Sequence, residues 1–400
     1  MRLRVIASVL LLVAAGTLVA ASPSAAPPEI TEGAEFTPAA LALFAVGACG
    51  DVAPPSNIPA SYLTKHCTIV KRAQEDYREA WVVKAQPFFA DKVPKAVPKK
   101  VVYPFAGGDL STALTVYPDA DEITTLSLEP AGDPRTLEAL AEPVASKNKA
   151  ARMNPALERA MQTIRDELRF LYKVNFSNTM NMISAMRGGL LPTQLVFGLS
   201  ALKIHGFEIV RLRYFTLTEA GAISYLTPAD VAAAPPVTGK ADTRNRVFAN
   251  AELQFRKPGG RVQIYRHIQA NLDDAHTKKD PRVLAHLRAK GPVAGMTKAA
   301  SYLLSWPEFS NIRTSLLENV VWMVSDATGV PPKLGRAAGF EYETYGAFKE
   351  PHIDAGKSIA KDWRDEWERQ PRRDLRFRFG YYDGSSRHTS HLVIMRKSKP

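Results

Sequence analysis

A small-molecule binding site is indicated by four residues of suitable type and spacing: Gly107, Gly108, Asp109 and Glu129. The glycines precede a helical segment, so backbone amides at the start of that helix could face an anion or a hydroxyl-rich ligand. Glu129 follows about 20 residues later, the spacing at which an acidic side chain binds ligand hydroxyls in nucleotide-binding units. A structural alternative stays open, in which the glycines form a tight turn, Asp109 caps the helix and Glu129 lies on the surface.

The elements that would position these residues form a βαβ unit. The sequence predicts a strand, a loop, a short helix and a second strand at Val101–Phe105, Ala106–Asp109, Leu110–Val116 and Glu122–Leu128. A right-handed crossover through a short helix normally links neighbouring parallel strands. The loop and Glu129 should therefore meet at one edge of the sheet. Tyr103 and Phe105 should point to the same face, where they either floor a pocket or join the core.

Residues 101–129 resemble the nucleotide-binding half of class I S-adenosylmethionine-dependent methyltransferases. In that family the glycine loop passes under the cofactor and the acidic residue binds its ribose hydroxyls. The resemblance implies a Rossmann-like core and ligand contacts at the four residues named above. The chain departs from the family because it lacks the Gly-x-Gly spacing and has Tyr103-Pro104-Phe105 where an acidic strand end is usual. We assign no cofactor.

A second resemblance covers residues 60–400 and is to a family of uncharacterised exported bacterial proteins. Its recurring pieces stand here as YPFAGGD, LEPAG, KAASYLL and FSNIR, at Tyr103–Asp109, Leu128–Gly132, Lys298–Leu304 and Phe309–Arg313. The family implies export and no particular activity. It favours one continuous unit over two separable domains.

The N-terminus has the order of a secretory signal peptide. Arg2 and Arg4 precede an uncharged, largely apolar run, Val5–Ala21, and small residues with prolines follow at Ser22–Pro28. We expect cleavage between residues 21 and 26, and a protein in the periplasm or cell envelope with no transmembrane helix after cleavage. A retained membrane anchor is the alternative.

Two cysteines, Cys49 and Cys67, are the only ones in the chain. An even, nearby pair in an oxidising compartment predicts a disulfide. The run Phe36–Ala48 predicts a buried helix that begins at Thr37-Pro38. Because Val46–Cys49 imitates the sequence before a bacterial lipidated cysteine, a lipoprotein anchored through Cys49 is the alternative.

The expected fold class is α/β, with a Rossmann-like, mostly parallel sheet and a terminal β-hairpin, preceded by an N-terminal helical hairpin. We divide the chain into a signal peptide (1–26), the helical hairpin with its disulfide (27–96), the Rossmann-like core (97–275) and an α+β C-terminal part packed on the core (276–400). The main elements predicted are helices at 62–85, 155–174, 190–202, 296–304 and 310–326, a strand at 207–217, and hairpins pairing 247–256 with 261–270 and 376–382 with 391–396.

Several other chemical patterns point to no site. Ser358 and Lys361 match the Ser-x-x-Lys of penicillin-binding enzymes, but the companion elements that should follow are missing. His388 and His391 should point to opposite faces of a strand, which prevents joint metal binding. The set His267, Asp273, Asp274 and His276 has no diagnostic metal spacing, and we expect a solvated helix start there. We assign no metal.

The charge pattern bears on which classes of partner the protein could bind. The formal net charge is +12, but the basic residues of the C-terminal part alternate with acidic ones, so we expect no nucleic-acid binding. The partner is unknown, with a small molecule or an envelope component as candidates.

Two hypotheses for the function follow. The first is an exported envelope protein whose degenerate methyltransferase-like core serves binding or structure. The second is an enzyme with a small-molecule pocket at the carboxyl ends of the sheet strands.

Overall fold

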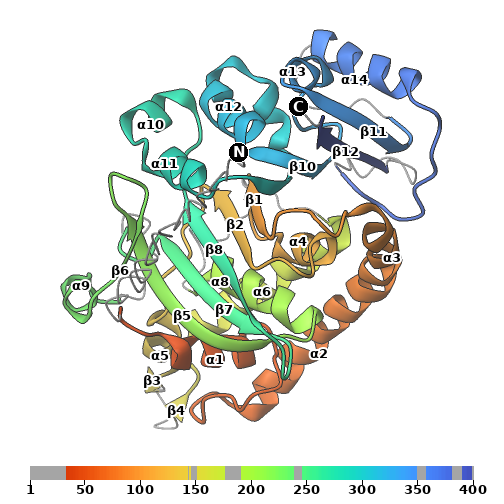
Figure 1. Cartoon of the computed structure of the whole chain (residues 1–400). Helices are drawn as coiled ribbons and strands as arrows, with labels where there is room; N and C mark the ends of the chain where they lie inside the picture. The colour runs from red at the N-terminus through yellow and green to blue at the C-terminus, as the bar shows by residue number, and fades with distance from the viewer. Residues whose placement is uncertain are drawn as a thin grey trace, which may run out of the picture. The chain divides into compact units, whose positions relative to one another are not determined.

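A ten-stranded sheet with helices on both faces forms the centre of the protein (Figure 1). The computed structural model describes residues 33–142, 144–145, 151–175, 191–237, 246–348, 357–380 and 390–398. Gly33–Pro400 make up one compact unit. The fold class is α/β, as predicted.

The middle of the sheet is parallel. Its five strands are, in spatial order, β10 (Val320–Ser325), β9 (Val293–Met296), β1 (Lys100–Pro104), β2 (Glu122–Ser127) and β8 (Val262–Gln269). β1 and β2 are adjacent and parallel, which confirms the βαβ unit. The hairpin of β8 with its antiparallel neighbour is also confirmed.

Antiparallel pairs extend the sheet on both sides. Beyond β8 come β7 (Asn250–Arg256), β5 (Glu208–Leu217) and β6 (Ile223–Tyr225), and beyond β10 come β12 (His391–Lys397) and β11 (Phe340–Gly346). A separate two-stranded ribbon pairs β3 (Val144–Ala145) with β4 (Ala151–Arg152).

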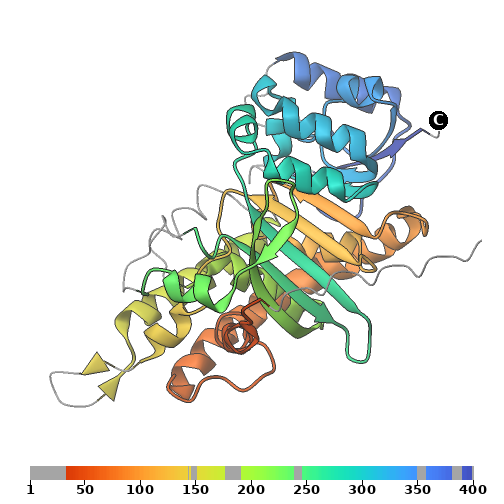
Figure 2. The same cartoon turned by 60° about the vertical axis from the view of Figure 1, so that its left-hand side comes forward.

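The helices form two layers, each over its own apolar core (Figures 1 and 2). The first layer contains α1 (Thr37–Val46), α2 (Ala60–Tyr77), the π-helical turn η1 (Arg78–Val82), α3 (Val83–Lys92), α4 (Leu110–Val116), α5 (Thr136–Ala141), α6 (Pro155–Val174) and α8 (Thr193–Ile204). The second face carries α10 (Asp274–Lys279), α11 (Arg282–Ala289), the 3₁₀ turns η2 (Ala300–Ser305) and η3 (Pro307–Phe309), α12 (Ser310–Asn319), α13 (Pro332–Ala337) and α14 (Lys357–Arg369). The short helix α9 (Pro228–Ala233) buries no side chain.

Local sequence explains where the site-bearing helices begin and end. The Asp109 side chain accepts a hydrogen bond from the Thr112 amide and so caps α4. At the start of α6 the Asn154 side chain caps the helix, and Pro155 is the first residue of the helix. The same helix ends at Asn175, whose φ of 59° is a left-handed conformation that asparagine tolerates better than most residues.

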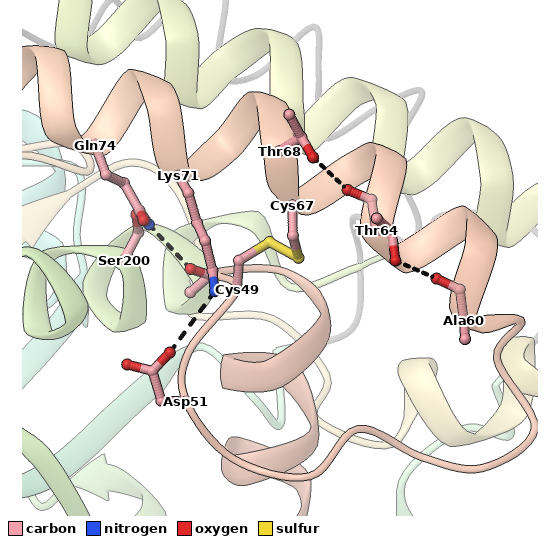
Figure 3. Close-up of a disulfide and its surroundings, with 10 residues drawn as sticks. Cys49, Asp51, Ala60, Thr64, Cys67, Thr68, Lys71, Gln74 and Ser200 are labelled. Atoms are coloured by element: carbon pink, nitrogen blue, oxygen red, sulfur yellow. Dashed lines mark hydrogen bonds and ion pairs between the residues drawn. A yellow bond between two sulfur atoms is a disulfide. The ribbon is translucent and has the colours of Figure 1, made fainter.

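A disulfide joins Cys49 to Cys67 and ties the end of α1 to α2 (Figure 3), as predicted. The two Cα atoms are 5.4 Å apart. Near the bridge, Gln74 reaches from α2 to the Ala48 carbonyl and the Ser200 hydroxyl. Because α1 packs on β5 and α8 while α2 packs along α6, these helices form part of the main core.

Three predicted elements of the C-terminal part are wrong. The segment predicted as a helix from Ser310 to Asp326 is a helix only to Asn319 and continues as strand β10, because its β-branched and aromatic side chains fit a buried pleat. The helix predicted over residues 296–304 is the end of β9 followed by η2. The expected hairpin partner of β12, residues 376–382, has no strand within its described part, residues 376–380. Here β12 instead lies between β10 and β11.

Within the described residues, no helix is both long enough and apolar enough to cross a bilayer.

Candidate ligand-binding site

Four ionisable residues follow four of the five parallel strands, one after each. Asp109 follows β1 through the glycine turn, Glu129 follows β2, Lys298 follows β9 and Asp326 follows β10. All four residues are at most 3% exposed. Open α/β sheets place their ligands at the carboxyl ends of the strands, and a charge is buried there only when it is paired or hydrogen-bonded. This edge is therefore the candidate site.

Asp109 and Lys298 are the centre of a buried polar cluster. Lys298 Nζ donates to Asp109 Oδ2 over 2.7 Å, to Thr112 Oγ1 over 2.8 Å and to Asn175 Oδ1 over 3.2 Å. The Tyr103 hydroxyl donates to the same Asp109 oxygen over 3.1 Å. Asp109 thus caps its helix, as the structural alternative expected, and it also balances a buried ammonium group.

Burial lowers the pKa of the Lys298 amine, while the Asp109 carboxylate opposes that shift. The rings of Trp81 and Phe379 lie 5.6 Å and 5.7 Å from Nζ, close enough for a cation–π contribution. An amine in such surroundings can position an acceptor group or act as a base. Its immediate neighbours decide which ligands can reach it.

The glycine turn is packed against α8. A Cβ atom on Gly108 would lie 2.0 Å from Cδ2 of Phe197, so only glycine fits there without a shift of the ring. Gly107 has a φ of 52°, and its carbonyl accepts a hydrogen bond from Gln194 Nε2 over 2.6 Å. The turn therefore has a packing role, in agreement with the structural alternative.

Glu129 is buried, which corrects the surface position that the structural alternative gave it. Its carbonyl accepts a 2.7 Å hydrogen bond from His267 Nε2, and His267 Nδ1 lies 3.3 Å from both Gln194 Nε2 and Thr125 Oγ1. Burial lowers the pKa of His267 to about 4, so the ring is neutral at pH 7. Gln194 and His267 thus connect Glu129 to Gly107.

The structure therefore brings the four predicted residues to one edge but divides them between two networks. Asp109 belongs with Lys298, while Gly107 and Glu129 belong with Gln194 and His267. The prediction that Tyr103 and Phe105 share a face is wrong. β1 ends at Pro104 and Phe105 turns to a φ of 57°, so Tyr103 joins one apolar core and Phe105 packs against the other.

A groove of about 700 Å³ is lined in part by Asn175, one of the residues that Lys298 contacts. It is formed by the end of α2, η1 and the last turns of α6. The lining residues are Ala73, Asp76, Tyr77, Ala80, Trp81, Asp166, Arg169, Phe170, Tyr172, Lys173, Asn175 and Arg378. π-helical turns such as η1 occur frequently at functional sites. The groove contacts the buried cluster, because Asn175 and Trp81 belong to both.

A second cavity, of about 970 Å³, lies where β5 and β8 end. Both of its arginines have partners. Arg282 binds Asp280 and the Leu217 carbonyl, and Arg246 binds Gln269. It does not reach the Lys298 cluster.

The remaining predicted groups separate in the structure. His267 lies inside the sheet, Asp273 caps α10 and binds His276, and Asp274 binds Ser310, so the expected helix start is confirmed. Within the described parts of the chain no three His, Cys, Asp or Glu side chains are placed to hold a metal ion. His388 and the Ser358 side chain lie outside the described residues.

Sequence reasoning did not identify Lys298 and Asp326 as site residues. A usable signal exists, since each is the first charged residue after a buried apolar run, Val293–Met296 and Val320–Val324 respectively. Assigning helices to both regions concealed that these residues end parallel strands.

Comparison with models of known protein families gave no match, and comparison with curated proteins gave no significant match. The two resemblances seen in the motifs stay predictions. The chemistry of the site must come from its own residues.

Proposed function

We propose that this chain is an exported cell-envelope protein that acts by binding, and that its methyltransferase-like βαβ unit does not hold S-adenosylmethionine. The observation that supports this most directly is the packing of α8 on the glycine turn. Phe197 fills the space beside Gly108, and Gln194 takes the Gly107 carbonyl. A cofactor that passed over this turn would have to displace both side chains.

Calorimetric titration of the mature protein with S-adenosylmethionine and S-adenosylhomocysteine tests this. We expect no binding heat from either compound. Saturable binding of either one, lost in a Glu129→Gln variant that stays folded, would overturn the proposal and restore the cofactor site.

The disulfide supports export, because such bridges form in oxidising compartments. It also supports a soluble form over a lipoprotein. The Cys49 sulfur is bonded to Cys67 and has no thiol left to carry a lipid, and Cys49 is buried. Cell fractionation followed by N-terminal sequencing should find a periplasmic protein that begins between residues 21 and 27. Material that begins at Met1, or at an acylated Cys49, would contradict this.

An enzyme is the second candidate, and Lys298 is the observation in its favour. Its amine has a lowered pKa and lies at the strand ends where open α/β enzymes bind substrates. Reductive methylation with formaldehyde and cyanoborohydride at pH 7 distinguishes the two. The binding proposal expects Lys298 to stay unmodified while exposed lysines react. Rapid and selective modification of Lys298 would favour the enzyme.

A further inference from the structure

We propose that the groove between η1 and α6 binds a carbohydrate, and that Nδ2 of Asn175 donates a hydrogen bond to one of its oxygens. This rests on the binding function proposed above and adds the place and the ligand class. The inference depends on three features of the groove: a buried amide with a free donor, an aromatic wall, and charges of both signs at the rim.

The orientation of the Asn175 amide is fixed by Lys298. An ammonium group can only donate, so the atom 3.2 Å from Nζ must be the amide oxygen. Nδ2 is then the other end, and it has no hydrogen-bond partner among the described residues. The side chain is about 95% buried and lines the groove. A buried donor without a partner is unfavourable, so an acceptor from a ligand would be favoured there.

The aromatic wall suits a ring with apolar C–H faces. Tyr77 and Trp81 are stacked with their planes 18° apart, Tyr172 lies 4.9 Å from Tyr77, and Phe170 lines the same groove. Aromatic rings with a polar edge pair well with ligands that alternate apolar and hydroxylated surface. Pockets of this volume take small organic ligands.

The rim has both donors and acceptors. Asp76 and Asp166 have carboxylate acceptors, while Arg169 and Lys173 have donors. The ion pairs of Asp76 with Arg72 and of Asp166 with Arg169 are long, at 3.9 Å, and exposed, so a ligand can compete for these groups. A field of mixed sign does not select a strongly charged ligand. Sugar hydroxyls both donate and accept, so they can use every group in this set. A carboxylic acid would use only the donors and would be repelled by Asp76 and Asp166.

Trp81 makes the binding measurable. The first probes are the disaccharides cellobiose, maltose and di-N-acetylchitobiose. Binding is measured by Trp fluorescence and by calorimetry. At least one should bind saturably and change the fluorescence. In a Trp81→Phe variant that change should disappear, since the signal comes from this tryptophan and not from the other four.

Asn175→Gly is the deciding variant, because glycine keeps the left-handed φ and removes the amide. We expect it to weaken sugar binding at least 10-fold. Asp76→Asn, which keeps the shape of the rim but removes a charge, should weaken it less. Asp280→Asn at the second cavity is the matched control and should leave affinity unchanged. Circular dichroism and the melting temperature check that each variant is folded.

The outcomes separate this inference from the proposed function. Binding that survives Asn175→Gly unchanged overturns the site. If no probe sugar binds, the ligand class is wrong, and native mass spectrometry of periplasmic protein then decides the function itself. A retained small molecule of another class would keep the binding function alone. A protein that carries no molecule and binds none of the probes would overturn both.

Discussion

Lys298 and Asp109 are 189 positions apart in the sequence, yet Nζ and Oδ2 are 2.7 Å apart. Their side chains are 0% and 4% exposed. The pairing is possible because β1 and β9 are neighbours, so the segments that follow them leave the sheet side by side. This contact links the first half of the chain to the second at the point where the site lies.

Replacing Lys298 with methionine should destabilise the protein by about 3–5 kcal/mol, because Asp109 would remain as a buried charge without its cation. Urea denaturation measures the change in the free energy of unfolding. The double variant with Asp109→Asn should recover part of this loss. Lys361→Ala, which breaks an exposed pair with Asp365, is the control and should change stability by less than ~1 kcal/mol. Equal effects at the two positions would show that the buried pair is not a stability determinant.

Removal of the Cys49–Cys67 bridge should reduce stability by about 3 kcal/mol, as the chain-entropy model gives for a separation of 18 residues. The measurement compares the Cys49→Ala/Cys67→Ala double variant with the native protein in urea. A reducing agent should lower the stability of the native protein only. Thiol labelling of unreduced, denatured protein should find no reactive cysteine, and two labelled cysteines would disprove the bridge.

Gly108→Ala should destabilise the protein by about 1–3 kcal/mol, since the new methyl group meets the Phe197 ring. The smaller side chain in Phe197→Leu should relieve much of this, so the two substitutions should couple in a double-mutant cycle. Gly259→Ala is the matched control. Its Cβ has open space, and only the φ of 69° opposes it. Any coupling of Gly259→Ala to Phe197→Leu would mean that the cycle reports something other than the clash.

Stability should fall as pH drops from about 6.5 towards 4. Burial lowers the folded-state pKa of His267 from 6.5 to about 4, so between these values the unfolded chain binds the proton more readily. For a pKa shift of this size, the neutral ring contributes about 3 kcal/mol of stability above pH 6.5. This contribution is lost as the pH falls towards 4. Burial likewise lowers the pKa values of His66, His205 and His286 to about 4, and they add to the effect.

His267→Gln should make the pH dependence of stability less steep, because one fewer proton is taken up on unfolding. The measurement is the free energy of unfolding in urea between pH 7.5 and 4. Glu122 provides a comparison in a different window. Burial alone would raise its pKa, but Lys290 and Arg266 outweigh this and lower it from 4.5 to about 2. Glu122→Gln should therefore reduce the loss of stability below pH 4.5. It should leave the pH dependence between 6.5 and 4.5, which comes from the histidines, unchanged. An unchanged slope in His267→Gln would place the proton uptake elsewhere.

The sequence predicted the elements whose signals are local. The βαβ unit, α6, the β7–β8 hairpin and the disulfide follow from alternation, caps, turn residues and cysteine count within short stretches. The course of the chain after residue 290 could not be predicted in the same way. Val320–Ser325 has apolar residues with no helical or alternating period, because a central parallel strand is buried on both faces. Such a run does not distinguish a strand from a buried helix.

The candidate site was predictable to the level of one sheet edge. Asp109 and Glu129 follow strands that the pattern reveals, so their common edge was correctly expected. The pairing of Asp109 with Lys298 depends on β9 lying beside β1, and nothing near Lys298 in the sequence encodes that neighbour. The groove depends on α6 packing along α2, a contact between helices far apart in the chain.

The place of β12 sets the order in which the sheet can be completed. β12 comes later in the chain than all other described strands, yet it lies between β10 and β11 and forms hydrogen bonds with both. During synthesis, β11 therefore has no partner among the other described strands until residues 391–397 have left the ribosome. The edge of the sheet formed by β12 and β11 can be added only after β9 and β10 are available to pair.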